Sequence, residues 1–386
     1  MDFEFTPEEK EFQREVRSFL EKEVTAEAAR EHHSGQGLGP HSRALLRRMG
    51  EHRLLAPTWP KKYGGLELSP VTRFILTEEM SYHDAPYPLT CLEVAGPGLL
   101  HFGTEEQRAA YLTRITSGEI EFATAYTEPG AGSDVAALTL NAEDRGDHYI
   151  VNGQKTFSSH AHYCDYIWLA ARTDKTVPKH QGISMFIVDP KSPGITVHGM
   201  QTMAGVRTNE VFFDNVEVPA KNIVGERNRG WDYMVGALNY ERGGTVGDLQ
   251  RPFDELVAYV AEARRAGKIT ADDDWISEEL ARLATELHIG RLLIYRVAEL
   301  QERKANLTYE ASLGKLYSSQ VREHLFDVAM RVLGLFGQLR DWSKWIHLHA
   351  KMQALFLDSP RWSIVAGASE IQRNIMAIRG LGLPSK

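Results

Sequence analysis

The chain has few cysteines and no long hydrophobic run, and each absence restricts its class. Only Cys91 and Cys164 occur among 386 residues, which excludes a disulfide framework and fits a reducing compartment. No uninterrupted apolar stretch approaches the roughly 20 residues that a membrane span requires. Residues 1–5 are acidic and do not resemble a secretory signal. We therefore expect a soluble, cytoplasmic protein.

Basic clusters and nucleotide-binding glycine motifs are also absent. The formal net charge is -8, and Lys and Arg form no cluster longer than pairs such as Arg47-Arg48, so nucleic-acid binding is not expected. No Gly-x-Gly-x-x-Gly motif follows a predicted strand, which argues against a Rossmann nicotinamide site. The paired histidines, such as His32-His33, lack the accompanying ligands of a metal site. We expect no metal.

The length suffices for two or three packed units. The pattern of hydrophobic and turn-forming residues changes twice along the chain. Residues 1–120 read as helical, with an N-cap predicted at Thr6 and a capping box predicted for Thr104 with Gln107. Residues 121–228 carry short β-branched and aromatic runs with predicted turns at Asn152-Gly153 and Pro193-Gly194, typical of a small antiparallel β unit. Residues 229–386 are helical again. The sequence therefore predicts an α+β protein of three parts in the order α, β, α.

Two long helices are expected in the last part. A helical stripe runs from Ile276 to Leu300, and a second helix is predicted over residues 311–333. The polar tract between Arg264 and Asp274 is expected to connect two helices. Lys315 and Lys344 are interpreted as surface charges.

The segment Ala125–Asp134 is the most informative run. It contains two hydroxyls, two carboxylates and two glycines. Glycine lets the backbone approach a ligand closely, and the hydroxyls of Thr127 and Ser133 both donate and accept hydrogen bonds. The run is either an ordinary turn or a cradle for a polar, planar or phosphorylated ligand.

Taken together, the motifs make the sequence similar to the acyl-CoA dehydrogenase family along nearly its whole length. Besides the helical opening, the matching segments are Tyr63–Gly65, Ala125–Asp134, Asn152–Lys155, Phe213–Pro219, Val224–Gly230 and Gly367–Arg373. The resemblance implies FAD bound between a middle β-barrel-like domain and a C-terminal four-helix bundle. It also implies an acyl-CoA substrate and electron-transferring flavoprotein as the electron acceptor.

Family roles transfer to individual positions of this chain. Tyr126 and Thr127 match residues at the flavin edge, and Gly132 and Ser133 lie where the loop meets the FAD pyrophosphate and the substrate thioester. Phe157 matches an aromatic residue that packs on the flavin, and Ser159 matches a hydroxyl near its N5. The resemblance thus implies a flavin-facing half-site.

The resemblance also assigns the catalytic base. In much of the family a glutamate late in the chain removes the α-proton, but the aligned segment here is Val365–Ala368 and has no carboxylate. Glu241 matches the earlier position that a subset of the family uses, and Arg242 and Gly243 would then lie beside the substrate. The alternative is that Glu241 and Arg242 form part of a solvated helix face.

Two segments that complete a neighbouring subunit's FAD site in homotetrameric members are altered here. Alanines replace the expected arginine and phenylalanine in Ala263–Gly267, and Leu335 replaces a glycine in Arg331–Gly337. This pattern resembles actinobacterial enzymes of sterol side-chain degradation, which pair two related chains as α2β2. A homotetramer, an acyl-CoA oxidase or flavin monooxygenase of the same fold, and a non-catalytic partner subunit remain the alternatives.

Overall fold

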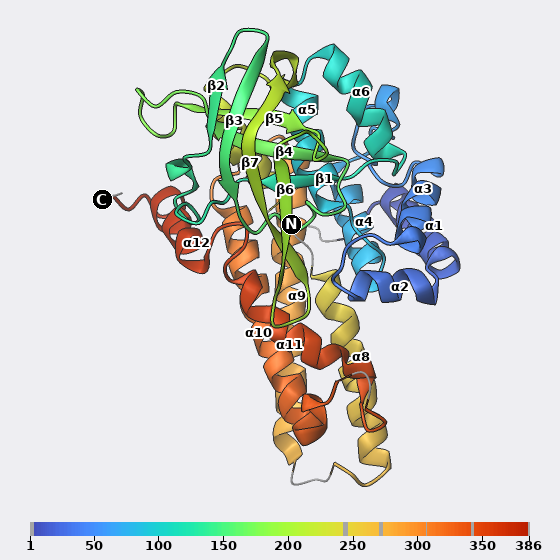
Figure 1. Cartoon of the computed structure of the whole chain (residues 1–386). Helices are drawn as coiled ribbons and strands as arrows, with labels where there is room; N and C mark the ends of the chain where they lie inside the picture. Colours follow the sequence, from blue (N-terminus) through green and yellow to red (C-terminus); the bar gives the residue numbers. More distant parts are fainter. Residues whose placement is uncertain (1–3, 242–245, 270–272, 306, 341–342, 385–386) are drawn as a thin grey trace.

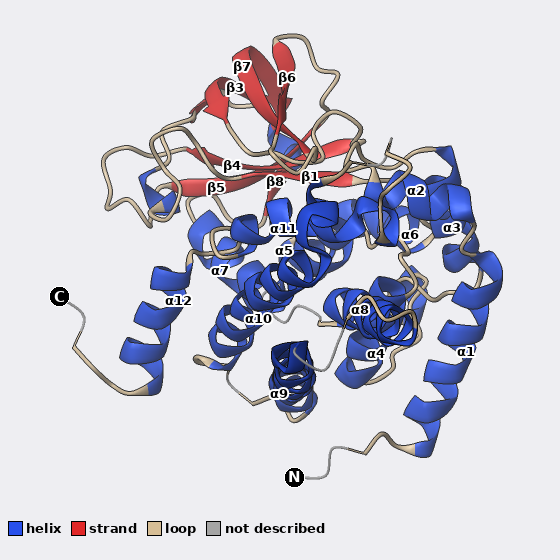
Figure 2. Ribbon diagram, turned by 90° about the horizontal axis from the view of Figure 1, so that it is seen from below, coloured by secondary structure: helices blue, strands red, loops and turns tan. Residues whose placement is uncertain are grey.

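The computed structural model describes residues 4–241, 246–269, 273–305, 307–340 and 343–384, and it confirms the predicted order of helices, sheet and helices. Figure 1 shows the N-terminal helices beside the sheet and the long C-terminal helices extending away from it. Figure 2 shows the strands gathered on one side of the molecule, with the helices below them. Within the described ranges, no helix is long and apolar enough to cross a membrane.

Six α-helices and one π-helical segment form the N-terminal part. They are α1 (Pro7–Glu23), α2 (Ala26–His33), α3 (Pro40–Glu51), α4 (Pro70–Tyr82), the π-helical segment Thr90–Ala95, α5 (Gly96–Phe102) and α6 (Glu105–Thr116). The predicted N-cap at Thr6 is confirmed, and Glu9 completes a capping box there that the sequence analysis did not predict. The predicted capping box of Thr104 with Gln107 is present. Apolar residues of α1, α3 and α4 pack together and against α9, so this part is joined to the C-terminal helices.

The middle part is an eight-stranded sheet. Its strands are β1 (Phe122–Ala125), β2 (Asn141–Asp144), β3 (His148–Lys155), β4 (Tyr166–Arg172), β5 (Ile183–Val188), β6 (Ile195–Gln201), β7 (Arg207–Pro219) and β8 (Ile223–Val224), in the order β6-β7-β3-β2-β4-β5-β8, with β1 on β4. Most pairings are antiparallel, as predicted, whereas β1 and β2 each pair with β4 in parallel. One face encloses a core of its own and the other packs on the π-helical segment, α5 and α7.

The predicted turn at Asn152-Gly153 is wrong, because both residues lie inside β3. Gly153 has φ +140°, and the register of β3 against β7 shifts between Val151 and Gly153. A glycine of this kind accommodates a bulge as readily as a hairpin turn. The turn predicted at Pro193-Gly194 does separate β5 from β6.

The described residues of the C-terminal part form six α-helices. They are α7 (Gly230–Glu241), α8 (Gly247–Arg265), α9 (Asp274–Glu302), α10 (Glu310–Leu333), α11 (Lys351–Trp362) and α12 (Ser369–Ile375). Helices α8 to α11 share one apolar core, which confirms the four-helix bundle, and both predicted long helices are present as α9 and α10. The surface position predicted for Lys315 is wrong: it is 9% exposed and donates to Gly367 O at 2.9 Å, because the chain before α12 covers α10.

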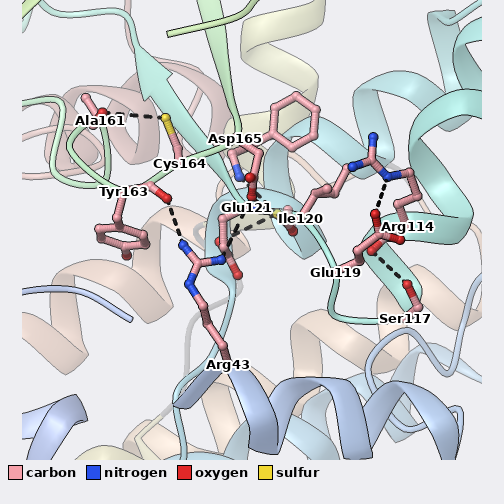
Figure 3. Close-up of polar contacts among 12 residues, drawn as sticks. Arg43, Arg114, Ser117, Glu119, Ile120, Glu121, Ala161, Tyr163, Cys164 and Asp165 are labelled. Atoms are coloured by element: carbon pink, nitrogen blue, oxygen red, sulfur yellow. Dashed lines mark hydrogen bonds and ion pairs between the residues drawn. The ribbon is translucent and has the colours of Figure 1, made fainter. Parts of the chain in front are cut away.

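A buried carboxyl group lies where β1 begins (Figure 3). Glu121 is 4% exposed, and the Cys91 thiol donates to its Oε2 at 3.7 Å. The backbone N–H of Glu121 donates to Asp165, and the Arg43 guanidinium lies 4.0 Å from that aspartate. Burial raises the pKa of the Glu121 carboxyl to about 8 because desolvation disfavours its charged form. Glu121 is therefore protonated in the folded protein at neutral pH.

We expect Glu121→Gln to change the pH dependence of stability. Between the ordinary carboxyl pKa and about 8, the folded wild type keeps this proton and the unfolded chain loses it, so wild-type stability declines as pH rises through this window. Glutamine removes that decline. Urea unfolding at pH 5 and pH 8 should show the variant gaining at least about 1 kcal/mol over wild type at the higher pH. Glu119→Gln is the control, because Glu119 is half-exposed and paired with Arg114; parallel pH curves for Glu121→Gln and wild type would contradict the assignment.

Candidate functional site

The loop that follows β1 presents an open face. Glu128 and Ala131 exchange backbone hydrogen bonds of 3.1 and 3.0 Å, which closes a tight turn around Gly130. A Cβ added at Gly130 or at Gly132 would meet no atom within 4 Å, and Ser133 is exposed. The loop is therefore a well-defined turn that leaves room for another molecule beside its glycines.

A buried ion pair fixes this loop to the end of β3. Lys155 is fully buried, and its Nζ donates to Glu128 Oε1 and to Tyr126 O, both at 2.9 Å. The Glu128 carboxylate also accepts from the backbone N–H groups of Thr139 and Leu140 at 2.6 and 2.8 Å. The Glu128 carboxylate and the Lys155 ammonium thus hold together the loop after β1, the residues just before β2 and the end of β3.

The pKa values of this pair follow from burial and mutual attraction. Burial by itself raises the pKa of the Glu128 carboxyl, but the Lys155 charge and the backbone donors outweigh it and hold that pKa below its usual range. Burial lowers the pKa of the Lys155 ammonium to about 8. Both groups are charged at neutral pH, so the pair orders the loop as an ion pair.

The segment after β3 lies next to the loop. Thr156 N donates to Thr127 O at 2.9 Å. This hydrogen bond joins the start of the segment that carries Phe157 and Ser159 to the loop that carries Tyr126 and Thr127. Phe157 has φ +56° and is 65% exposed, an unusual state for a bulky L-residue. Ser159 is exposed, and its hydroxyl lies 3.4 Å from that of Thr208.

These residues fit a planar, phosphorylated cofactor. An exposed aromatic ring provides a stacking surface, exposed hydroxyls provide hydrogen bonds, and the open glycines allow close backbone approach. The buried hydroxyl of Ser158, beside Phe157, has no partner within the described structure. The arrangement is that expected of one half of a flavin site.

The predicted base stands at the end of α7. Glu241 is the last residue of that helix, but its side chain lies outside the described structure, as do Arg242 and Gly243. Helix α7 packs on the π-helical segment, on α5 and on β5, and near its start Tyr233 stacks on Phe102 with ring centroids 4.0 Å apart. The helix is therefore firmly anchored to the sheet-facing core.

The late segment at which a carboxylate is missing is also well ordered. Ala366 and Gly367 have φ +53° and +95°. Their carbonyl groups accept from the fully buried Gln372 at 3.0 and 2.8 Å, and Lys315 supplies a further donor to Gly367. Side chains of α10 and α12 thus donate to the backbone of this segment, and the alanine side chain adds no ionisable group.

Sequence reasoning missed the roles of Glu128 and Lys155. Both lie in segments that match the family, but only the hydroxyls, glycines and aromatic residue of those segments were assigned roles. The available signal was the alternation along β3, in which Lys155 falls on the same side as the buried Tyr149 and Val151, because a buried ammonium requires a partner. The partner could not be identified from spacing, since 27 residues separate the two.

Comparison with known proteins gives the same assignment over the whole chain. Family models match as the N-terminal, middle and C-terminal domains of acyl-CoA dehydrogenase at residues 6–119, 123–216 and 228–381. The acyl-CoA dehydrogenase FadE26 of Mycobacterium tuberculosis is 32% identical and aligns over 100% of this chain and 99% of its own.

Solved structures agree in fold and in sequence. A chain of the Tcur3481-Tcur3483 steroid ACAD superposes with a TM-score of 0.92 at 32% identity, covering 100% of both chains. A chain of the ChsE4-ChsE5 complex from Mycobacterium tuberculosis gives a TM-score of 0.90 at 33% identity, again with 100% of both chains covered. This protein belongs to the acyl-CoA dehydrogenase family, whose members are flavoprotein oxidoreductases acting on a CH–CH group.

Proposed function

We propose that this chain is the catalytic, FAD-binding subunit of an α2β2 acyl-CoA dehydrogenase that converts a bulky, steroid side-chain-like acyl-CoA into the 2,3-enoyl-CoA. The observation that carries the cofactor proposal is the exposed Phe157 ring in a left-handed backbone conformation, next to a loop with open glycines. Bound FAD would supply the acceptor for the hydride that leaves the substrate β-carbon.

The residues of this chain have separate roles in the proposal. Tyr126 and Thr127 would contact the flavin edge, Phe157 would pack on the ring and Ser159 would hydrogen-bond beside it. Gly132 and Ser133 would admit the pyrophosphate, with Ser133 also near the thioester. Because the Lys155–Glu128 ion pair fixes the Tyr126 carbonyl, the loop would be ordered before either ligand binds.

Glu241 would act as the base that removes the α-proton. A carboxylate can do so if exclusion of water brings its pKa nearer to neutrality. Arg242 and Gly243 would line the thioester side of the pocket. The absence of a carboxylate at Val365–Ala368 supports this assignment, because it leaves Glu241 as the family-matched candidate.

The α2β2 arrangement is supported by the segments that differ from the homotetrameric pattern. Leu335, which stands at a glycine position, is 81% exposed, and the neighbouring Phe336 is 48% exposed. Such side chains obstruct close backbone approach to a neighbour's cofactor but suit an apolar contact with a different chain. The two structural relatives described above are themselves named as pairs of chains.

Co-production with a homologous partner, followed by native mass and FAD analysis, tests the assembly. We expect a heterotetramer with one FAD per two chains; a homotetramer with one FAD per chain would refute this assembly.

Anaerobic addition of an acyl-CoA should bleach the flavin, and electron-transferring flavoprotein should restore the absorbance of the oxidised flavin. Rapid reoxidation by air would instead indicate an oxidase or monooxygenase. If the partner purified without this chain still held FAD, this chain would be a non-catalytic subunit.

A further inference from the structure

Asn209, in β7, is a fully buried polar residue directly behind the Phe157–Ser159 segment. Its two Nδ2 hydrogens are shared among three acceptors, of which Ser158 O at 2.8 Å and Ser159 O at 3.2 Å are two. The backbone carbonyl of Asn209 also accepts from Ser158 N at 2.9 Å. One amide group therefore contacts the carbonyl groups of both residues that follow Phe157.

A histidine orients this amide. Asn209 Nδ2 lies 3.0 Å from His162 Nδ1, and the amide has no lone pair to offer at that atom. His162 Nδ1 is thus the acceptor, so Nε2 carries the hydrogen and donates to Gln36 O at 2.7 Å. On the other side, Asn209 Oδ1 accepts from Arg207 Nε at 3.1 Å. Contacts on both sides fix the direction of the amide.

The contact with Gln36 connects this segment to the N-terminal part of the chain. Gln36 lies between α2 and α3, and its Nε2 donates to Gly205 O at 2.8 Å. The adjacent Gly35 accepts from Arg207 N at 2.9 Å. The α2–α3 connection is thereby joined to the β6–β7 hairpin and, through His162 and Asn209, to the segment that carries Phe157.

This segment needs such support because its conformation is intrinsically unfavourable. A left-handed backbone is unfavourable for an L-residue, and it persists only where surrounding contacts determine it. The Phe157 ring is largely exposed and contributes little packing of its own. The hydrogen bonds from Asn209 to the next two carbonyl groups are the contacts suited to hold it.

We infer that Asn209, oriented by His162, is a positioning residue that presets the Phe157–Ser159 segment for a planar, ring-containing cofactor. The inference rests on the proposed function, in which that cofactor is FAD. Asn209 does not contact the cofactor; it acts through the backbone of residues 158 and 159. Its loss lets the aromatic ring and the Ser159 hydroxyl leave the geometry that receives the ring.

The test measures FAD binding to the complete protein, co-produced with its partner where one is required. Asn209→Ala removes the donor, and Asn209→Ser retains one hydroxyl. We expect the FAD Kd to rise about tenfold or more for the alanine variant and less for serine. We also expect altered visible circular dichroism and a shifted flavin midpoint potential in the alanine variant, readouts that a purely structural role would leave unchanged. Asn152→Ala is the matched control, because Asn152 lies on the neighbouring β3 and the hydrogen bonds described for its side chain are with Asn215.

An FAD Kd within twofold of wild type and an unchanged flavin spectrum for Asn209→Ala would overturn the inference. If both Asn209 variants fail to fold, His162→Ala decides: it removes the orienting acceptor from a partly exposed site, and an unchanged Kd and spectrum again overturn the inference. Failure of the proposed function is distinguishable, because wild type itself would then bind no FAD.

Discussion

Glu241→Gln is expected to lower the turnover of acyl-CoA by about a thousandfold, within the range that a positioned general base contributes. Glutamine has nearly the same shape but cannot accept the α-proton. Binding of acyl-CoA and FAD should persist, since neither needs the carboxylate charge in this proposal. Anaerobic stopped-flow measurement of flavin bleaching separates the chemical step from binding: the bleaching rate should fall while the acyl-CoA concentration for half-saturation changes little.

Two further variants make this result specific. Glu226→Gln removes an exposed carboxylate from the loop preceding α7 and should leave the bleaching rate unchanged. Ala366→Glu, added to Glu241→Gln, places a carboxylate at the late position used by much of the family. The native residue there is already an L-residue with φ +53°, so glutamate adds no new backbone requirement. Partial recovery is expected with a small acyl-CoA; full turnover in the single Glu241→Gln variant would show that another group is the base.

The fold could be predicted from the sequence where local rules determine it. The N-cap at Thr6, the capping box at Thr104, the stripe of α9 and the β-branched runs each depend on residues close in the chain, and the structure confirms them. Asn152-Gly153 was misassigned because a bulge and a hairpin turn make the same demand on glycine. Lys315 was misassigned because its burial depends on the segment before α12, which is distant from it in the sequence.

The residues of the candidate site also divide into those that the sequence predicts and those that only the folded chain reveals. Its exposed residues, such as Phe157 and Ser133, could be named because a collinear family resemblance carries positions across directly. The residues that hold them in place could not. Lys155 and Asn209 act through partners on other strands and loops, and only the folded chain brings these groups together.

Lys155→Met is expected to destabilise the protein by about 3–5 kcal/mol, the usual effect of removing one partner from a buried ion pair. Methionine keeps most of the volume but leaves the Glu128 carboxylate buried without its cation and frees Tyr126 O from its donor. Urea unfolding of the FAD-free protein measures this loss, and reconstitution should show weaker FAD binding because the loop is no longer fixed. The same substitution at Lys179 is the control: its 2.6 Å pair with Asp134 is on the same loop but half-exposed, and such pairs contribute about 1 kcal/mol or less.

Adding Glu128→Gln to Lys155→Met separates the charge effect from the loss of packing. The double variant no longer buries an unpaired charge, so it should recover part of the stability lost by Lys155→Met alone. It should not recover FAD affinity, because Tyr126 O still lacks the Lys155 donor. In addition, the single amide oxygen cannot accept all three hydrogen bonds that the two carboxylate oxygens accept from Thr139 and Leu140. Equal losses for Lys155→Met and Lys179→Met would show that the buried pair does not order the loop, and the preorganised half-site would then need another explanation.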